Sequence, residues 1–400
     1  MLDLYLDHCS TSPLDPAVAS EMSAAWLAPW GNPASPHRRG QAARQALETA
    51  REAIARRLGA DIAAVGGERL VFTSGGTESN NLALLGLAGP PPGEILVSPV
   101  EHPSVLAATA ELARRGFTVH PLPVDDQGRV ILDQLSARLS PAVRLVSVQW
   151  GNHETGVIQP LAEVVQQCAA VGVPVHCDAV QAVGKVPVDF RQLGLAALTF
   201  TAHKIHGPVG IGGLLLRPGL APTPLCWGGT QQLGTRPGTE PVVLAVGFAR
   251  ALELAQPELE LPQSPLAERR DQLEHELAAQ VPDIVISGAA ARRLPHVSNV
   301  AFLGLDRQTL LLALDRAGVA CSSGPACQSG AAEPSPVLRA LGAPPAVIAG
   351  ALRFSVGRFT SPADISLAVE RISSVVNTLR SRFRTGNYAS PTRHPTARPL

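Results

Sequence analysis

The chain has 400 residues, 45% of them hydrophobic and 16% charged, which is enough apolar material for one large core and a smaller second one. Basic and acidic residues both number 33, so no general electrostatic field would attract nucleic acid. The first residues, MLDLYLDH, lack the basic region of a signal peptide, and no apolar run has membrane-spanning length, so we expect a cytoplasmic protein with no nucleic-acid or membrane partner.

From residue 41, apolar residues recur at helical spacing in QAARQALETAREAIARRLGA, and short apolar runs then alternate with helix-like sequence. The predicted strands in this part are Leu70–Phe72, Glu94–Val97, Arg144–Val148, Pro174–His176, Ala197–Phe200 and Ile211–Arg217. Such alternation predicts an α/β fold with a mostly parallel sheet and helices on both faces.

A stretch rich in proline and polar residues, Gln256–Pro265, separates two compositional halves. Beyond it we expect helices at Leu266–Gln280 and near Pro362–Arg382, and strands at Ile284–Ile286, Val297–Phe302 and Leu352–Val356. We therefore predict a large domain over residues 15–255 and a smaller α+β domain built from residues 1–14 and 256–384. Residues 385–400 have almost no apolar content, which predicts a disordered tail.

Polar residues follow five of the predicted strands, at the point where each strand ends. They are Gly75, Gly76 and Thr77 after the first strand, His102 after the second, Asn152, His153 and Glu154 after the third, Asp178 and Gln181 after the fourth, and Thr201, His203 and Lys204 after the fifth. Ligands of open parallel sheets bind beyond the carboxyl ends of the strands, so we expect these side chains to share one crevice.

This set of residues matches the needs of pyridoxal 5′-phosphate (PLP). The aldehyde of PLP requires a lysine amine and its ring nitrogen a carboxylate, for which Lys204 and Asp178 are the candidates. The N–H groups of a helix that begins at Gly75-Gly76-Thr77 can bind the phosphate, with Thr201 and His203 completing the site. Each signal is weak alone, because such a glycine loop is as often a plain helix cap and a lysine after a strand is usually on the surface.

The same residues lie in motifs that resemble those of the cysteine desulfurases, a family of the aminotransferase class V superfamily with PLP fold type I. The matching motifs span almost the whole chain: Tyr5-Leu6-Asp7, Gly31–Ser35, Thr73–Asn80, Asp178–Gln181, Thr201–Lys204, Gly228–Thr239, Ser322–Cys327 and Leu352–Ser355. The resemblance implies a homodimer with shared active sites, PLP as cofactor and L-cysteine as substrate.

The resemblance also implies how the cofactor is held. Lys204 binds the aldehyde, His102 stacks on the pyridine ring, Asp178 pairs with the ring nitrogen and Gln181 contacts the phenolic oxygen. Thr239 would reach into the phosphate site of the neighbouring subunit.

One motif departs from the family pattern. Where the family reads N-N-E-x-G, with the second asparagine on the phenolic oxygen, this chain reads Asn152-His153-Glu154-Thr155-Gly156. His153 can still donate one hydrogen bond, but an imidazole is bulkier and titrates near neutrality.

For the substrate, the resemblance implies that Arg353 and Asn32 bind the carboxylate side and that Cys327 lies in the mobile loop of the long-loop class. Lys204 would act as general base on the α-proton, with His102 as a helper. The Cys327 thiolate would then attack the substrate sulfur, giving alanine and a persulfide. A sulfur-acceptor protein of iron–sulfur cluster assembly or tRNA thiolation would receive the sulfur.

Two alternatives remain open from the residues. The first is another PLP enzyme, a cysteine or cystine C–S lyase or an aminotransferase, which needs no nucleophilic cysteine. The second is a non-catalytic metal-binding scaffold that uses Cys321 and Cys327. We predict no metal site, because the cysteines form no Cys-x-x-Cys pair. Apart from Cys327, we expect the thiols to pack as small apolar side chains: Cys9, Cys168, Cys177, Cys226 and Cys321.

Overall fold

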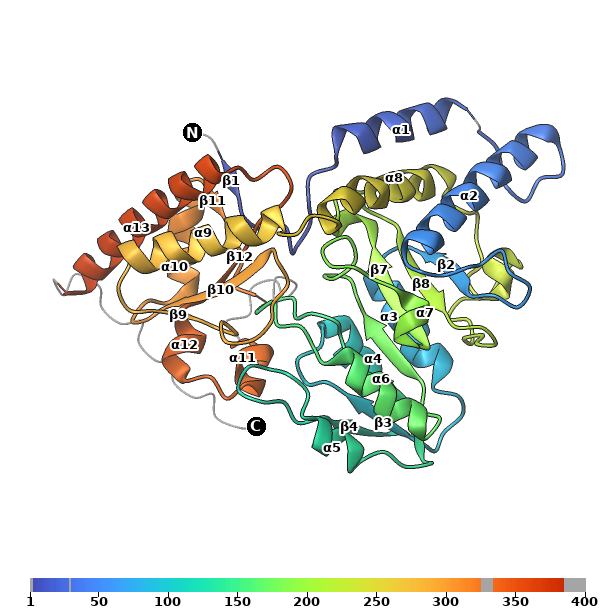
Figure 1. Ribbon diagram of the computed structural model, residues 1–400, viewed down its shortest axis with the longest axis horizontal. Coiled ribbons are helices and arrows are strands. Elements are labelled where there is room, and N and C mark those ends of the chain that lie inside the picture. Colours follow the sequence, from blue (N-terminus) through green and yellow to red (C-terminus); the bar gives the residue numbers. More distant parts are fainter. Residues whose placement is uncertain (1–2, 29, 325–333, 385–400) are drawn as a thin grey trace, which may run out of the picture.

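The structure is a computed structural model that describes residues 3–28, 30–324 and 334–384 (Figure 1). The predicted tail at 385–400 and the predicted nucleophile Cys327 lie outside the described residues.

A seven-stranded sheet has the order β2-β8-β7-β6-β5-β3-β4. Its strands are β2 (Arg69–Thr73), β3 (Glu94–Val97), β4 (Thr118–Pro121), β5 (Val143–Ser147), β6 (Val175–Asp178), β7 (Ala197–Thr201) and β8 (Gly212–Leu216). Only β8 pairs antiparallel with its neighbours in this sheet, so the predicted α/β fold with a mostly parallel sheet is confirmed. The edge strand β4 is missing from the sequence prediction, because no residue of it is buried and its apolar signal is weak.

The helices of this part are α1 (Pro16–Leu27), α2 (Arg38–Arg57), α3 (Gly76–Leu87), α4 (Pro103–Arg114), α5 (Leu132–Ser136), α6 (Leu161–Ala170), α7 (Phe190–Leu193) and α8 (Val242–Leu259). α1 begins where Asp15 accepts a hydrogen bond from the Ala17 N–H and Pro16 occupies the first turn. α2 and α1 both pack on α8 (Figure 1), whereas α3 packs across β6, β7 and β8.

A second group of elements has its own apolar core. It contains the antiparallel sheet β12-β10-β9, in which β9 is Ile284–Ile286, β10 is Val297–Phe302 and β12 is Ala351–Ser355. The helices are α9 (Pro265–Gln280), α10 (Arg307–Arg316), α11 (Pro336–Ala340), α12 (Pro345–Gly350) and α13 (Pro362–Arg384). The strands and the two helices predicted in this part are therefore confirmed.

The amino terminus joins this second group, since β1 (Leu4–Tyr5) pairs parallel with β11 (Val319–Ala320). Leu4 and Leu6 belong to the same buried cluster as Phe302 and Phe354. On the other side of the junction, α8 continues to Leu259, so only residues 260–264 of the predicted transition at Gln256–Pro265 are non-helical. Among the described residues no helix combines the length and apolarity needed to cross a bilayer.

Two leucines of α10 offer a matched test of the second core. Leu310 is fully buried, whereas Leu312 is 65% exposed. We expect Leu310→Ala to lower the free energy of unfolding by about 2–5 kcal/mol, because it leaves a cavity, and Leu312→Ala to change it by no more than about 0.5 kcal/mol. Urea denaturation at one protein concentration measures both; equal effects would contradict this packing.

A buried histidine in the large sheet predicts a pH dependence of stability. His176 on β6 bonds to the hydroxyls of Ser147 and Thr199 on the neighbouring strands, and burial lowers its pKa to about 4. Below pH 6.5 the His176 side chain becomes protonated in the unfolded chain but stays neutral in the folded chain. The free energy of unfolding therefore falls progressively as the pH decreases from 6.5 toward 4.

His176→Gln removes this titration. Given the pKa of about 4, we expect the wild type to lose about 2 kcal/mol of unfolding free energy relative to the variant when the pH falls from 7 to 5. Urea denaturation at the two pH values checks it. A pH-independent difference would mean that the folded protein accepts the proton on His176 after all.

Candidate active site

A cavity of about 780 Å³ opens at the carboxyl ends of the large sheet's strands. Most of the sequence-predicted site residues line it: Gly76, Thr77, His102, His153, Asp178, Gln181, Thr201, His203, Lys204 and Arg353. They come from segments that follow β2, β3, β5, β6 and β7, together with β12 of the second group. The structure therefore brings together residues that are up to 277 positions apart in the sequence.

Five described residues that were predicted to belong to the site do not line this cavity: Asn32, Gly75, Asn152, Glu154 and Thr239. Asn152 is buried, and its Oδ1 accepts the N–H groups of Glu154 and Thr155, both at 2.8 Å, so its side chain shapes the turn after β5. Asn32 is exposed and accepts the Ala34 N–H, and Thr239 is also exposed. In this single chain Asn32 and Thr239 are surface residues.

Lys204 ends a short 3₁₀ turn, Ala202–Lys204, directly after β7. Its Nζ donates to the backbone carbonyls of Cys9 and Ser10, the latter at 2.6 Å. The Cys9 carbonyl also accepts the amide of Gln181 at 3.0 Å. The amino-terminal segment thus supplies acceptors for the lysine, which the strand-end argument did not anticipate.

The Asp178 carboxylate lies at the end of β6, held at both oxygens. Oδ2 accepts the side-chain amide of Asn80 at 2.7 Å, and Oδ1 accepts the Val180 N–H at 3.0 Å. Nearby Glu101 is fully buried, and its pKa is raised well above the usual range by burial and then by the charge of Asp178. The backbone N–H of Gln149, which donates to Glu101 Oε1 at 2.5 Å, opposes this rise.

Asn80 and Glu101 are site residues that sequence reasoning missed. Asn80 is the last residue of the TSGGTESN motif and lies one helical turn after Gly76, on the same face of α3, so helical spacing is a signal that would have found it. Glu101 precedes His102 in a loop, and no pattern distinguishes it from a solvated carboxylate.

Two imidazoles meet edge to face beside this acid. The rings of His102 and His153 have centroids 5.4 Å apart and planes at 71°. The N–H of Ser104 donates to His102 Nδ1, so a neutral His102 carries its proton on Nε2. Burial is the largest cause that lowers the pKa of both rings; Lys204 and Arg353 lower it further, and Asp178 opposes them at His102. Both rings are therefore neutral at physiological pH.

Arg353 points into the cavity from β12, as the alternation along that strand predicts. Its Nη1 donates to the His153 carbonyl at 2.9 Å, and its Nη2 to Asp7 Oδ1 at 2.9 Å and Ser10 Oγ at 2.8 Å. Nε is buried without a hydrogen-bond partner among the described residues. A buried guanidinium with one donor unused suits a carboxylate ligand.

The start of α3 has the features of an anion site. No side chain caps the helix at Gly75, so the first-turn N–H groups lack that partner. A Cβ at position 76 would lie 2.8 Å from Val180 Cγ2, so a larger residue there would require the Val180 side chain to shift. PLP requires a site for its phosphate, a carboxylate for its ring nitrogen and an amine for its aldehyde. The start of α3, Asp178 and Lys204 supply these three groups, so the residues present fit this cofactor.

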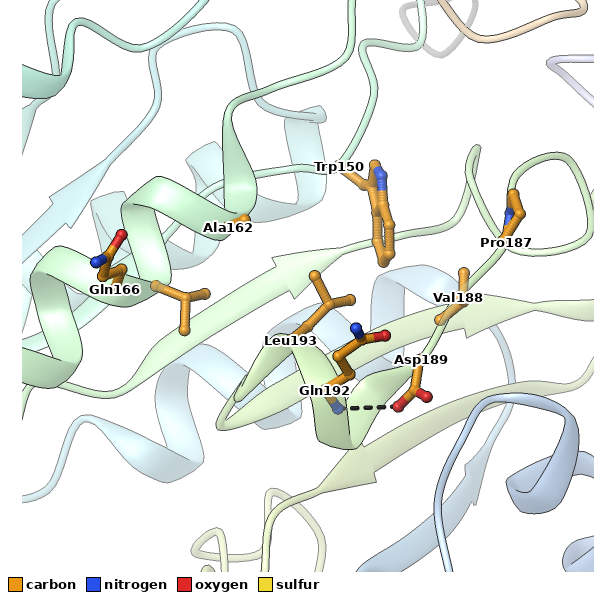
Figure 2. A pocket seen from close by; sticks show the side chains of 9 residues that line it. Trp150, Ala162, Gln166, Pro187, Val188, Asp189, Gln192 and Leu193 are labelled. Carbon is orange, nitrogen blue, oxygen red and sulfur yellow. Dashed lines mark hydrogen bonds between the residues drawn. The ribbon is translucent and has the colours of Figure 1, made fainter.

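A second pocket, of about 650 Å³, lies between α6 and α7 (Figure 2). The indole of Trp150 projects into it, facing Leu193 and Val188. The pocket contains no lysine or nucleophile, and the Asp189 carboxylate is occupied by the Gln192 N–H at 2.9 Å. It therefore lacks the groups of an active site.

Most of the described cysteines have thiols that are shielded from solvent and therefore unreactive. Cys168 and Cys177 are buried and Cys321 is half-buried, and burial raises the pKa of Cys168 and Cys321 to about 12. The prediction that Cys226 packs inside is wrong, since this thiol is exposed. Within residues 3–28, 30–324 and 334–384 no three metal-ligating side chains cluster.

Comparison with known proteins identifies the family. The model of the aminotransferase class-V family matches residues 4–367. A cysteine desulfurase from Klebsiella pneumoniae is 40% identical over 382 residues, 95% of this chain and 94% of its own. A solved NifS-like protein superimposes with a TM-score of 0.87 at 31% identity, over 94% of this chain and all of its own. SspA, solved in complex with cysteine, gives 0.77 at 29% identity, over 88% of this chain and 98% of its own. The chain belongs to the class-V aminotransferase family and, within it, to the PLP-dependent cysteine desulfurases.

Proposed function

We propose that the protein removes sulfur from L-cysteine, releases L-alanine and leaves the sulfur as a persulfide on Cys327. The observation that carries this proposal is that Lys204, Asp178 and Arg353 share one cavity with the uncapped start of α3. The substrate is supported by SspA, a relative solved with cysteine.

In this proposal Lys204 holds the aldehyde of PLP, Asp178 the protonated ring nitrogen and the first turn of α3 the phosphate, while His102 faces the ring and Gln181 the phenolic oxygen. PLP, when bound, supplies an electron-accepting ring that makes the substrate Cα–H acidic and its sulfur open to attack. Asn80 keeps Asp178 in place through its side-chain amide.

The chain's own groups then carry the reaction. Arg353 orients the substrate through its carboxylate, and Lys204 Nζ accepts the α-proton and later returns a proton to the product. His102 Nε2–H is a donor beside these groups. The Cys327 thiolate attacks the substrate sulfur, so that the new S–S bond forms as the C–S bond breaks.

Several predictions from the sequence enter the proposal unchanged. The protein is a homodimer in which Thr239 contacts the phosphate in the partner's site, and Asn32 lies near the substrate. The sulfur passes to an acceptor protein of iron–sulfur assembly or tRNA thiolation. The protein is cytoplasmic, and its two domains meet near residue 255. The separate apolar core that includes Leu4 and Phe354 supports the division. The strongly exposed Trp26 and Trp227 support an interface.

The reaction is tested by product analysis on two variants. With a thiol reductant present to release the persulfide sulfur as sulfide, we expect the wild type to give alanine and sulfide in equal amounts. Lys204→Ala should lower the rate by about 10²–10⁴-fold or more, because the general base is lost. Cys327→Ser should keep the cofactor's absorbance yet form neither persulfide nor alanine. Sulfide production that survives the Cys327 change would instead indicate a C–S lyase.

The role of Thr239 is tested by mixing subunits. Thr239→Val should weaken PLP binding roughly tenfold, the effect of one lost hydrogen bond. A heterodimer of a Thr239→Val subunit and a Lys204→Ala subunit contains one site with both native residues if Thr239 acts across the interface. Equilibrium dialysis should then find native PLP affinity at the lysine-bearing site. Weakened affinity there would mean that Thr239 acts within its own subunit.

A further inference from the structure

Glu154 contacts described residues on both sides of the segment 325–333. On one side the Ser335 hydroxyl donates to Glu154 Oε2 at 2.6 Å in a buried hydrogen bond. On the other side the Gly324 backbone packs against the same carboxylate, since a Cβ there would lie 2.7 Å from Oε2. Gly324 also has φ +98°, a value that glycine adopts without strain. One oxygen atom is thus shared by the two flanks of the segment.

Glu154 itself is held from the active-site side. Its N–H donates to Asn152 Oδ1 at 2.8 Å, and the Asn152 amide donates to the Val100 carbonyl at 2.9 Å. The residue between them, His153, lines the cavity, and its carbonyl accepts Arg353 Nη1. The turn that presents His153 to the cavity therefore also presents Glu154 to the flanks of 325–333.

Both flanks have a second attachment. Ser322 exchanges two backbone hydrogen bonds with Arg353, at 3.1 and 2.6 Å. Ser335 also accepts the Leu338 N–H at 3.0 Å, which caps α11. Gly324, Pro334 and Pro336 line the cavity, so a shift of either flank would change the cavity wall.

The charges of Arg353 and Arg307 also act on Glu154, but the contact that joins it to the flank at Ser335 is a hydrogen bond. The pKa of Glu154 is raised by burial, against the opposing effect of the Ser335 hydrogen bond, and Oε1 has no hydrogen-bond partner among the described residues. Accepting the Ser335 hydroxyl requires a carbonyl-type oxygen at this position and no negative charge. A glutamine can supply such an oxygen, whereas an alanine cannot.

We infer that Glu154 is a positioning residue for sulfur transfer: its carboxylate holds Gly324 and Ser335, the described residues on either side of the segment that carries Cys327. The inference deepens the proposed function and rests on it. Glu154 touches neither of the groups that bind PLP, Lys204 and Asp178, so the sulfur-transfer step should depend on it far more than cofactor binding does.

The first test uses hydrogen exchange on the PLP-free protein. We expect the peptides that cover residues 322–324 and 334–338 to exchange faster in Glu154→Ala and in Ser335→Ala, and Glu154→Gln to match the wild type. Ser335→Ala removes the contact from the other end and leaves the turn after β5 intact, so it decides the question if Glu154→Ala fails to fold. Unchanged exchange in both alanine variants would overturn the inference, whatever reaction the protein catalyses.

The second test separates substrate binding from sulfur transfer in the PLP-loaded protein. After rapid mixing with L-cysteine, Glu154→Ala should show the wild-type spectral change of the cofactor, while persulfide formation on Cys327, read by mass spectrometry, slows roughly tenfold to a hundredfold. kcat should fall with little change in KM, and Glu154→Gln should restore it. Normal persulfide formation in Glu154→Ala, or an equal loss in Glu154→Gln, would contradict positioning through the Ser335 contact. A wild type that makes no alanine would refute the proposed function and leave the exchange result standing.

Discussion

Parallel pairing of β3, β5, β6 and β7 is the constraint on which the rest of the molecule depends. Parallel strands end at the same edge of a sheet, so whatever follows them is collected there regardless of its distance along the chain. His102, His153, Asp178 and Lys204 follow these four strands, and their convergence results from the topology. In these four strands every residue except Glu94 and Arg144 is buried, as expected for a parallel sheet that is covered on both faces.

At that edge Asp178 is surrounded by buried imidazoles and by the buried carboxyl group of Glu101. Asp178 is hydrogen-bonded at both oxygens, while burial keeps His176, His102 and His153 neutral and raises the pKa of Glu101. In an interior of low dielectric constant, a carboxylate surrounded by neutral imidazoles interacts strongly with a cationic ring nitrogen. The surrounding neutral groups are therefore as much a part of the electrostatic design as the acid.

The large sheet could be predicted from the sequence because most of its strands are short, mainly apolar runs that are followed by polar residues. The edge strand β4 could not, since its exposed side chains carry little apolar signal. Lys204, Asp178 and His102 were recognisable by their place after strands. Asp7 and Ser10 were not assigned roles, because their contacts with Arg353 join parts of the chain that no local pattern relates. Asn152 belonged to a matching motif, yet its side chain serves the backbone of its own turn.

The first ten residues hold two of the cations that line the cavity, Lys204 and Arg353. Asp7 and Ser10 accept from Arg353, and the carbonyls of Cys9 and Ser10 accept from Lys204. Removing the partner of a buried charge costs about 3–5 kcal/mol, so shortening the amino terminus by a few residues would damage the chemistry and the fold together. Trimming this end for expression, as if it were an ordinary frayed terminus, would delete part of the active site although no motif near Lys204 or Arg353 had been touched.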